Sequence, residues 1–198
     1  MDVRQLKVDF LSLSGHKIHG PKGVGALYIR DGVEAVPFML GGSHERYRRA
    51  GTENVPGIVG LGEACHLASR SLDDHKDLLG PIRDQFEQDV IERLAGCFLN
   101  GSRKGRVSHT SNISFDKVEG ETLLVALDFK GVAVSTGAAC ASGSLRPSHV
   151  LKAMKLSKRR IQGAIRFSLN RWTTAQDMDY ALESVVEAVT QIRNVAVV

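Results

Sequence analysis

The chain has 198 residues, 42% of them hydrophobic and 24% charged, a composition that excludes a disordered or fibrous protein. Its 26 Lys and Arg residues are interleaved with 22 Asp and Glu residues, and the net charge of +4 favours a small anionic ligand over nucleic acid. No run reaches the roughly 18 apolar residues of a membrane span, and no signal peptide opens the chain, so we expect a cytoplasmic protein that contacts no membrane.

The first 60 residues are predicted to form strands around a glycine-rich turn. The apolar run from Val8 to Leu13 predicts a buried strand, and Gly23 to Arg30 predicts a second one. The turn between them reads GHKIHGPKG, and a loop rich in Gly and Arg follows from Leu40 to Asn54.

The pattern then becomes helical from about Gly57 to Leu94, with Pro81 as a kink or a new helix start and Gly96 as the stop. A long helix often joins two lobes. We therefore place a boundary near residue 61, which gives domains 1–60 and 61–198.

The second domain is predicted to alternate strands and helices. Helices are expected from Ser148 and from Thr174, whose hydroxyl can cap its helix together with Asp177. The remaining expected elements are strands over 111–115, 132–135 and 164–169, a helix over 120–131 and a loop of small residues over 136–147. The fold class is therefore α/β, with an α+β second lobe.

Lys17 lies in the glycine-flanked turn, next to His16. A lysine that is partly desolvated near other cations can form a Schiff base with a carbonyl compound. Ser14 and His16, with Thr52 from the later loop, carry donors that can bind a phosphate group. Taken singly, each of these residues is also compatible with an ordinary surface turn.

Two further residues stand out in the second domain. Cys140 lies among small residues in TGAACASGSL, where a thiol could reach a substrate or be incidental, whereas Cys65 and Cys97 lie in apolar surroundings. An odd number of widely spaced cysteines predicts reduced thiols and no resident metal. Arg166 alternates with apolar residues in AIRFSL, so it either pairs with a carboxylate of the protein or binds one from a ligand.

Four stretches in order resemble the cysteine desulfurases of the class V aminotransferase superfamily: SLSGHKIHGPKG, GGSHERYRRAGTENVPGIVG, VEGETLLVALDFKGVAVSTGAACASGSLRPSHVL and IRFSLNRWTT. The resemblance runs from about Val8 to Val189. It implies the C-terminal part of a pyridoxal-phosphate fold type I large domain, over 1–60, followed by a small α+β domain, over 61–198.

The resemblance also implies roles for single residues. Lys17 would hold pyridoxal 5'-phosphate as a Schiff base, and Ser14 and His16 would bind its phosphate. Thr52 would reach the phosphate of a neighbouring subunit, which implies a homodimer. Arg166 and Asn112 would bind the substrate L-cysteine. Cys140 would take the sulfur as a persulfide for an iron–sulfur scaffold or another acceptor protein, and could transiently ligate an iron–sulfur cluster.

In this family the Schiff-base lysine lies near mid-chain, whereas only sixteen residues precede Lys17 here. We therefore expect the C-terminal half of a desulfurase, inactive unless the other half is supplied in trans. Two alternatives stay open: a selenocysteine lyase or another class V enzyme, and a non-catalytic fragment that binds a scaffold protein.

Overall fold

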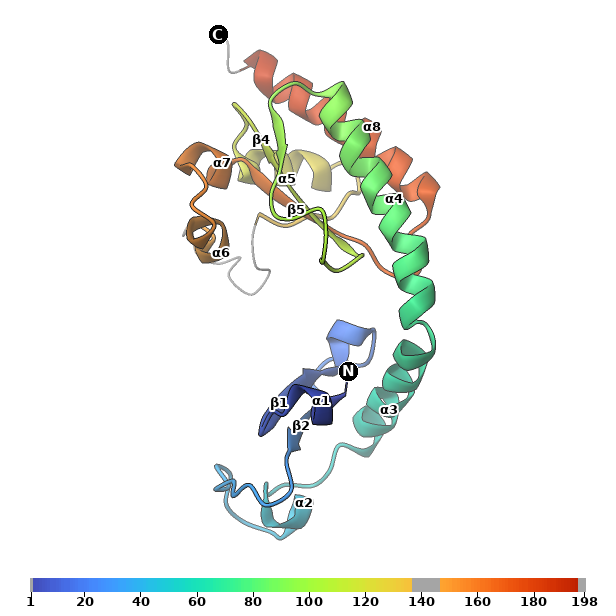
Figure 1. Ribbon diagram of the computed structural model, residues 1–198, viewed down its shortest axis with the longest axis vertical. Coiled ribbons are helices and arrows are strands. Elements are labelled where there is room, and N and C mark those ends of the chain that lie inside the picture. Colours follow the sequence, from blue (N-terminus) through green and yellow to red (C-terminus); the bar gives the residue numbers. More distant parts are fainter. Residues whose placement is uncertain (1, 137–146, 196–198) are drawn as a thin grey trace. The chain divides into compact units, whose positions relative to one another are not determined.

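The computed structural model describes residues 2–136 and 147–195, and the chain divides into two compact units, Met1–Leu72 and Asp73–Val198 (Figure 1). The boundary expected at 60/61 lies inside the helix α3 (Val55–Arg70). The division into compact units follows Leu72, just beyond the C-terminal end of that helix.

The first unit joins a β ribbon to short helices. In chain order its elements are α1 (Val3–Leu6), β1 (Phe10–Ser14), the 3-10 turn η1 (Gly15–Ile18), β2 (Gly25–Ile29), α2 (His44–Tyr47) and α3. The two strands pair antiparallel, from Phe10 opposite Ile29 to Ser14 opposite Gly25. Both predicted strands are therefore present, although β1 begins and ends slightly later than the apolar run indicated.

The first unit buries little apolar surface of its own. Leu61 and Ala64 of α3 are its buried hydrophobic side chains among the described residues. By contrast, Val36 is 92% exposed and Phe38 98% exposed. A two-stranded ribbon is at best marginally stable in water, so this unit has the surface of a structure that packs against additional polypeptide.

The second unit is built on an antiparallel sheet with the strand order β3-β4-β5, so β4 is central. The strands are β3 (Cys97–Leu99), β4 (Thr110–Phe115) and β5 (Ala164–Ser168). The helices are α4 (Leu72–Arg93), α5 (Gly120–Asp128), α6 (His149–Ala153), α7 (Lys158–Gln162) and α8 (Ala175–Val195).

The core of the second unit lies on one face of this sheet. Ile113 and Phe115 of β4 alternate with polar residues and are fully buried, as is Ile165 of β5. Helices α4, α5 and α8 cover this face, and Figure 1 shows α4 and α8 side by side. Their core residues include Phe86, Val90, Leu123, Leu127, Val185 and Val189. At the end of α4, Arg93 donates to Glu183 of α8 and lowers the pKa of that carboxyl.

Two features of the structure differ from the sequence predictions. The helical stretch expected from Gly57 to Leu94 is divided at Ser71, where the sequence indicated no break; the backbone N–H and hydroxyl of Ser71 both donate to the Leu67 carbonyl and close α3. The strand expected over 132–135 is reduced to an isolated bridge between Ser135 and Arg166. Helix α4 runs through Pro81 rather than starting there.

The predicted start of the last helix is confirmed. The Thr174 hydroxyl accepts a hydrogen bond from the backbone N–H of Asp177 (3.1 Å), and the Asp177 carboxylate accepts from the backbone N–H and hydroxyl of Thr174 (both 2.8 Å). These bonds form a capping box at the N-terminus of α8. The predicted buried stripe is also present, with Met178, Leu182, Val185 and Val189 buried and Ile192 packed against the core.

Replacing the capping threonine tests this helix start. Thr174→Ala is expected to lower the free energy of unfolding by about 1 kcal/mol, because the first turn loses a side-chain acceptor. The control Thr190→Ala, on the exposed side of α8, is expected to change it by less than about 0.5 kcal/mol. Thermal unfolding of both variants gives the comparison.

The same capping box predicts a pH dependence. Hydrogen bonds from the backbone and then the hydroxyl of Thr174 lower the pKa of Asp177. A carboxyl whose pKa is lowered by folding stabilises the fold above its ordinary pKa, and that contribution is lost as the pH falls through the lowered value. The difference in unfolding free energy between Thr174→Ala and the wild type should therefore become smaller in acid. A difference that stays constant from neutral to acid pH would contradict the role of Asp177 in the capping box.

Candidate functional site

The turn that carries Lys17 is fixed by backbone hydrogen bonds. The N–H of Gly15 donates to the Val24 carbonyl, and the N–H of Gly20 donates to the Gly15 carbonyl (both 2.9 Å). Gly15 is buried, and a Cβ atom there would lie 3.0 Å from the Val24 carbonyl oxygen. Glycine is therefore favoured at the point where β1 turns into η1, since a larger residue would crowd this backbone.

Ser14, His16 and Lys17 lie within four successive residues of this turn, with Gly15 between the first two. Ser14 ends β1 and is half-buried, whereas His16 and Lys17 lie in η1 and are exposed. A hydroxyl, an imidazole and a primary amine are thus presented together by a rigid backbone. They are the donor types that bind an anion, and the amine can also attack a carbonyl group.

Helix α3 supports the turn through small side chains. A Cβ atom at Gly60 would lie 2.6 Å from the ring of Pro21, and one at Gly20 would lie 3.1 Å from the Cβ of Ala64. Glycine and alanine therefore allow α3 and the turn to approach closely. This contact explains why a helix with a weak apolar stripe is held in place beside η1.

Thr52 lies in the exposed loop that precedes α3, next to Gly51, whose φ of +109° favours glycine. In the part of the chain that the structure describes, no hydrogen bond joins Thr52 to Ser14, His16 or Lys17. The structure therefore places Thr52 in the same unit as the turn without a hydrogen bond to these three residues.

Asn112 and Arg166 are brought together in the second unit. They are directly paired across β4 and β5, so their side chains project from the same face of the sheet. This is the face opposite the buried residues Ile113 and Ile165. Both side chains are half-buried. Sequence reasoning named each residue separately and did not predict that they are neighbours.

Arg166 keeps a buried donor that the protein does not use. Its Nε atom is buried and has no hydrogen-bond partner, and no carboxylate among residues 2–136 and 147–195 pairs with its guanidinium group. Of the two interpretations of this arginine, the internal ion pair is therefore absent from the described residues. A guanidinium in this state is suited to bind an external carboxylate in bidentate fashion.

A polar network that sequence reasoning missed orients Asn112. The Nδ2 atom of Asn100 donates to Oδ1 of Asn112 (2.7 Å) and to the hydroxyl of Ser114 (2.6 Å). Arg160 donates to Oδ1 of Asn100 (2.6 Å), so the amide orientation of Asn100 is set from α7. This bond fixes the orientation of the Asn112 amide, whose N–H groups form no hydrogen bond that is recorded among the described residues. The only sequence signal was the polar alternation within SNISF.

The remaining predicted residue, Cys140, lies outside the described residues. Cys97 is buried in the core, and burial raises the pKa of its thiol, as expected for a structural cysteine. Cys65 on α3 is half-buried. The candidate residues therefore form two sets, Ser14, His16, Lys17 and Thr52 in the first unit and Asn112 with Arg166 in the second.

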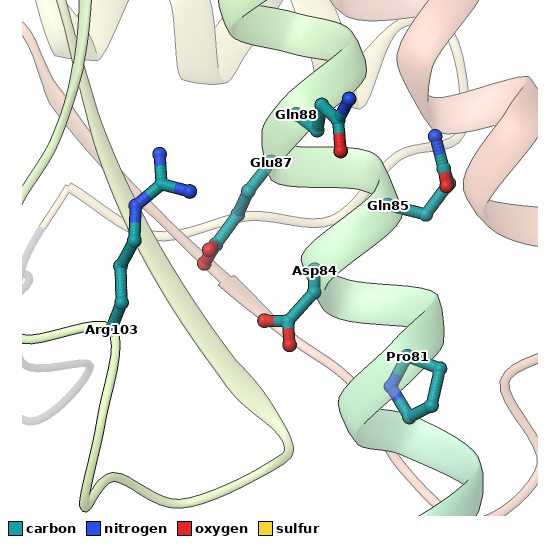
Figure 2. Close-up of a pocket in the computed structure, with 6 residues that line it drawn as sticks. All are labelled: Pro81, Asp84, Gln85, Glu87, Gln88 and Arg103. Atoms are coloured by element: carbon teal, nitrogen blue, oxygen red, sulfur yellow. The ribbon is translucent and has the colours of Figure 1, made fainter.

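A polar pocket of about 260 Å³ lies elsewhere in the second unit, between α4 and the loop that follows β3. Its lining includes Asp84, Glu87 and Arg103 and none of the predicted site residues (Figure 2). Asp84 and Glu87 are paired with Arg83 and Arg106, so its charged wall is already neutralised by the protein. We therefore interpret this pocket as a structural ion cluster.

Among the described residues, no group of three or more His, Cys, Asp or Glu side chains is placed to hold a metal ion. No helix in that part of the chain has the length and hydropathy needed to cross a lipid bilayer.

The family model for class V aminotransferases matches residues 1–181. The chain belongs to the class V aminotransferase family. This α/β chain is 48% identical over 193 residues to a cysteine desulfurase of Bradyrhizobium diazoefficiens, and the match covers 98% of the chain and 49% of that protein. It is 47% identical over 196 residues to cysteine desulfurase IscS of Methanosarcina thermophila, with coverages of 99% and 48%.

Solved structures of the family share this fold. A NifS-like protein with 35% sequence identity superposes with a TM-score of 0.87 over 96% of this chain and 49% of that one. The class V chain thus spans about half the length of the curated and solved relatives that it matches.

Proposed function

We propose that this chain is the C-terminal half of a pyridoxal-phosphate-dependent cysteine desulfurase, with 1–60 as the end of the cofactor-binding domain and the rest as the linking helix and small domain. The observation that carries the proposal is the η1 turn, where a class V chain presents Ser14, His16 and Lys17 together. Relatives named cysteine desulfurase, at 48% and 47% identity, support the choice of reaction.

The donor set fits pyridoxal phosphate. The cofactor has an aldehyde, which a primary amine can bind covalently, and a phosphate, which hydroxyl and imidazole donors can bind. The exposed Lys17 supplies the amine, and Ser14 and His16 supply the donors. Gly15, between Ser14 and His16, is buried against neighbouring backbone, so the side chains of Ser14, His16 and Lys17 are presented on one closely packed turn.

When bound, pyridoxal phosphate supplies an electron sink for the substrate. Arg166 binds the carboxylate of L-cysteine through its free guanidinium donors, and Asn112 adds its amide N–H groups. The primary amine of Lys17 would hold and move protons as a general base. The Cys140 thiolate then forms an S–S bond to the substrate sulfur. The Cβ–S bond breaks, its electrons stay with carbon, and protonation gives alanine.

Thr52 is proposed to act in a homodimer. It is exposed, is not bonded to its own turn, and lies in a loop next to the exposed apolar residues Phe38 and Leu40. Exposed apolar surface of this kind is usually covered in the functional assembly. We therefore infer that the active unit contains further polypeptide, both a second subunit and the length of the relatives that this chain does not match.

Covalent trapping tests the cofactor assignment. The chain is incubated with pyridoxal phosphate, reduced with borohydride and mapped by peptide mass spectrometry. The label is expected on Lys17 and should disappear in Lys17→Ala. The matched control is Lys22→Ala, an exposed lysine between η1 and β2, which should keep the label. A label on Lys22, or one spread over many lysines, would overturn the assignment.

A second assay addresses the reaction. The chain alone should release no sulfide from L-cysteine with a reductant. When the other half is supplied in trans, sulfide release should appear and should require Cys140. Robust turnover by the chain alone would overturn the proposal that the other half is needed. Activity that survives Cys140→Ala would favour a selenocysteine lyase or another class V reaction. Failure to take up the cofactor, together with capture of an iron–sulfur scaffold protein, would favour a non-catalytic fragment.

A further inference from the structure

Positive and negative side chains are interleaved over most of this chain, but one segment carries charge of a single sign. The segment 129–176 contains nine Lys and Arg residues and no Asp or Glu, whereas the rest of the chain has 17 Lys and Arg and 22 Asp and Glu. The segment therefore contributes +9, and the remainder −5, to the net charge of +4. Helices α6 and α7 lie within this segment, directly after the stretch that contains Cys140.

Part of this positive charge is already used inside the protein. Arg159 forms an ion pair with Asp116 (2.6 Å), and Arg160 bonds Asn100 and lies over the ring of Phe98. Lys130 pairs with Glu187 of α8 (2.8 Å). These contacts hold the sheet and its helices together. The positive charges of Arg159 and Lys130 are neutralised by their ion pairs and do not contribute to the attraction of a partner protein.

Three lysines on α6 and α7 are different. Lys152, Lys155 and Lys158 are exposed and form no ion pair among the residues that the structure describes. They lie on α6, just after α6 and at the start of α7. Lys155 has a φ of 58° and closes the turn that joins the two helices, so the three ammonium groups are spaced along one short helical corner.

The same corner exposes apolar side chains. Val150 of α6 is 54% exposed, and Met154, the residue that follows α6, is 40% exposed. Leu151 is buried against Ile161 and Ala164. Exposed apolar side chains that include methionine, close in the chain to unpaired charges, have the composition of a protein–protein interface. A nucleic-acid surface would instead present stacking aromatic residues among its cations.

We propose that the α6–α7 corner, formed by Val150, Lys152, Met154, Lys155 and Lys158, is the docking surface for an acidic face of the protein that accepts sulfur. Charge complementarity selects an acidic partner, steers its approach and fixes its orientation. The identity of this partner as the sulfur acceptor rests on the proposed function, because the corner directly follows the segment that contains Cys140.

The test measures binding without relying on activity. The full chain is titrated into a fluorescent peptide rich in Glu and Asp with one cysteine, and anisotropy is recorded at low and high salt. Binding should weaken with salt, and the triple variant K152E/K155E/K158E should bind about 10-fold more weakly than the wild type, because three charges are reversed. The variant K152Q/K155Q/K158Q removes the three charges without reversing them, so its affinity for the peptide should lie between those of the wild type and K152E/K155E/K158E.

The matched control reverses three exposed lysines outside the segment, K7E/K22E/K104E, and includes Lys7, which like Lys155 has a positive φ. It should bind the peptide within about 2-fold of the wild type. Equal losses in both triple variants would overturn the docking surface, as would equal binding of a peptide with Gln and Asn in place of Glu and Asp. Tighter binding of a single-stranded RNA of equal charge would also overturn it, in favour of nucleic acid.

A second arm separates this proposal from the proposed function. Borohydride trapping of pyridoxal phosphate on Lys17 should be the same in K152E/K155E/K158E and the wild type, because the changed residues lie in the other unit. Loss of peptide binding with normal trapping supports the docking surface. Normal peptide binding by K152E/K155E/K158E overturns it and leaves the cofactor assignment intact. Failed trapping in the wild type overturns the proposed function and leaves the anisotropy result to decide the docking surface.

Discussion

Replacing Gly163 with alanine is expected to destabilise the second unit by about 3 kcal/mol. A Cβ atom at this position would lie 2.3 Å from the carbonyl oxygen of Phe115 and 2.9 Å from that of Val118. Both obstacles are backbone atoms, so no side chain can rotate away. The strain would fall on the hydrogen bond from Phe115 N–H to the Gly163 carbonyl (2.9 Å), which joins the end of α7 to β4.

A second glycine provides the control for this prediction. Gly80 lies inside α4, and a Cβ atom there would meet nothing within 4 Å. Gly80→Ala is therefore expected to change the unfolding free energy by less than about 0.5 kcal/mol, because the helix propensity of alanine is offset by the contact of its Cβ with the ring of Pro81, the next residue. Chemical denaturation of both variants gives the comparison. If Gly163→Ala unfolds at the same denaturant concentration as Gly80→Ala, the close approach at Gly163 is not present in solution.

The position of Gly163 also matters for the candidate site. It lies between α7, which carries Arg160, and β5, which carries Arg166. A shift of this junction would change how β5 pairs with β4, and hence whether Arg166 stands opposite Asn112. The destabilising substitution should therefore also disturb the carboxylate binding that we propose for Arg166.

The sequence predicted features that depend on nearby residues. The capping box of Thr174 and Asp177 and the side-chain cap of Ser148 on the backbone N–H of Leu151 each involve residues three apart, and both are present. The apolar stripe of α8 is likewise a local pattern. These features could be predicted because the interacting groups are adjacent in the chain.

The missed features depend on residues far apart in the sequence. The segment 132–135 has the apolar composition of a strand, but in the structure only Ser135 forms a bridge, to Arg166. The strand β3 is a short run after Gly96 that is recognisable only through its pairing with β4. The contact between Arg160 and Asn100 joins residues 60 apart. No local pattern encodes such pairings.

The candidate site divides in the same way. The neighbouring residues Ser14, His16 and Lys17 were predictable as one turn, because β1 and β2 flank a glycine-rich segment. For Arg166, local alternation left two interpretations open, and only the absence of a carboxylate on its face of the described sheet distinguishes them. The orientation of Asn112 by Asn100 could not be predicted, since it requires the register of β4 and β5 with their neighbours.

Replacing Glu87 with alanine is expected to destabilise the second unit by about 3 kcal/mol. Glu87 is 3% exposed and pairs with Arg106, which also lies 3.7 Å from Asp84. Figure 2 shows Asp84 and Glu87 extending from α4 toward the side on which Arg103 lies. Removal of Glu87 would leave the largely buried guanidinium of Arg106 without its main partner, and an uncompensated buried charge is costly.

A double variant separates the cost of leaving Arg106 unpaired from the cost of removing both charges of the ion pair. In E87L/R106L both charges are removed and apolar volume is retained, so most of the stability lost in Glu87→Ala should return. The control Glu92→Ala, on the exposed side of α4 where Glu92 accepts from Gln88 (2.7 Å), should change the unfolding free energy by less than about 0.5 kcal/mol. Denaturant titrations of all three variants decide the matter. Two results would contradict the prediction: Glu87→Ala unfolding at the same denaturant concentration as Glu92→Ala, or E87L/R106L being less stable than Glu87→Ala. Either would show that the buried ion pair of Glu87 and Arg106 does not contribute to stability in the expected way.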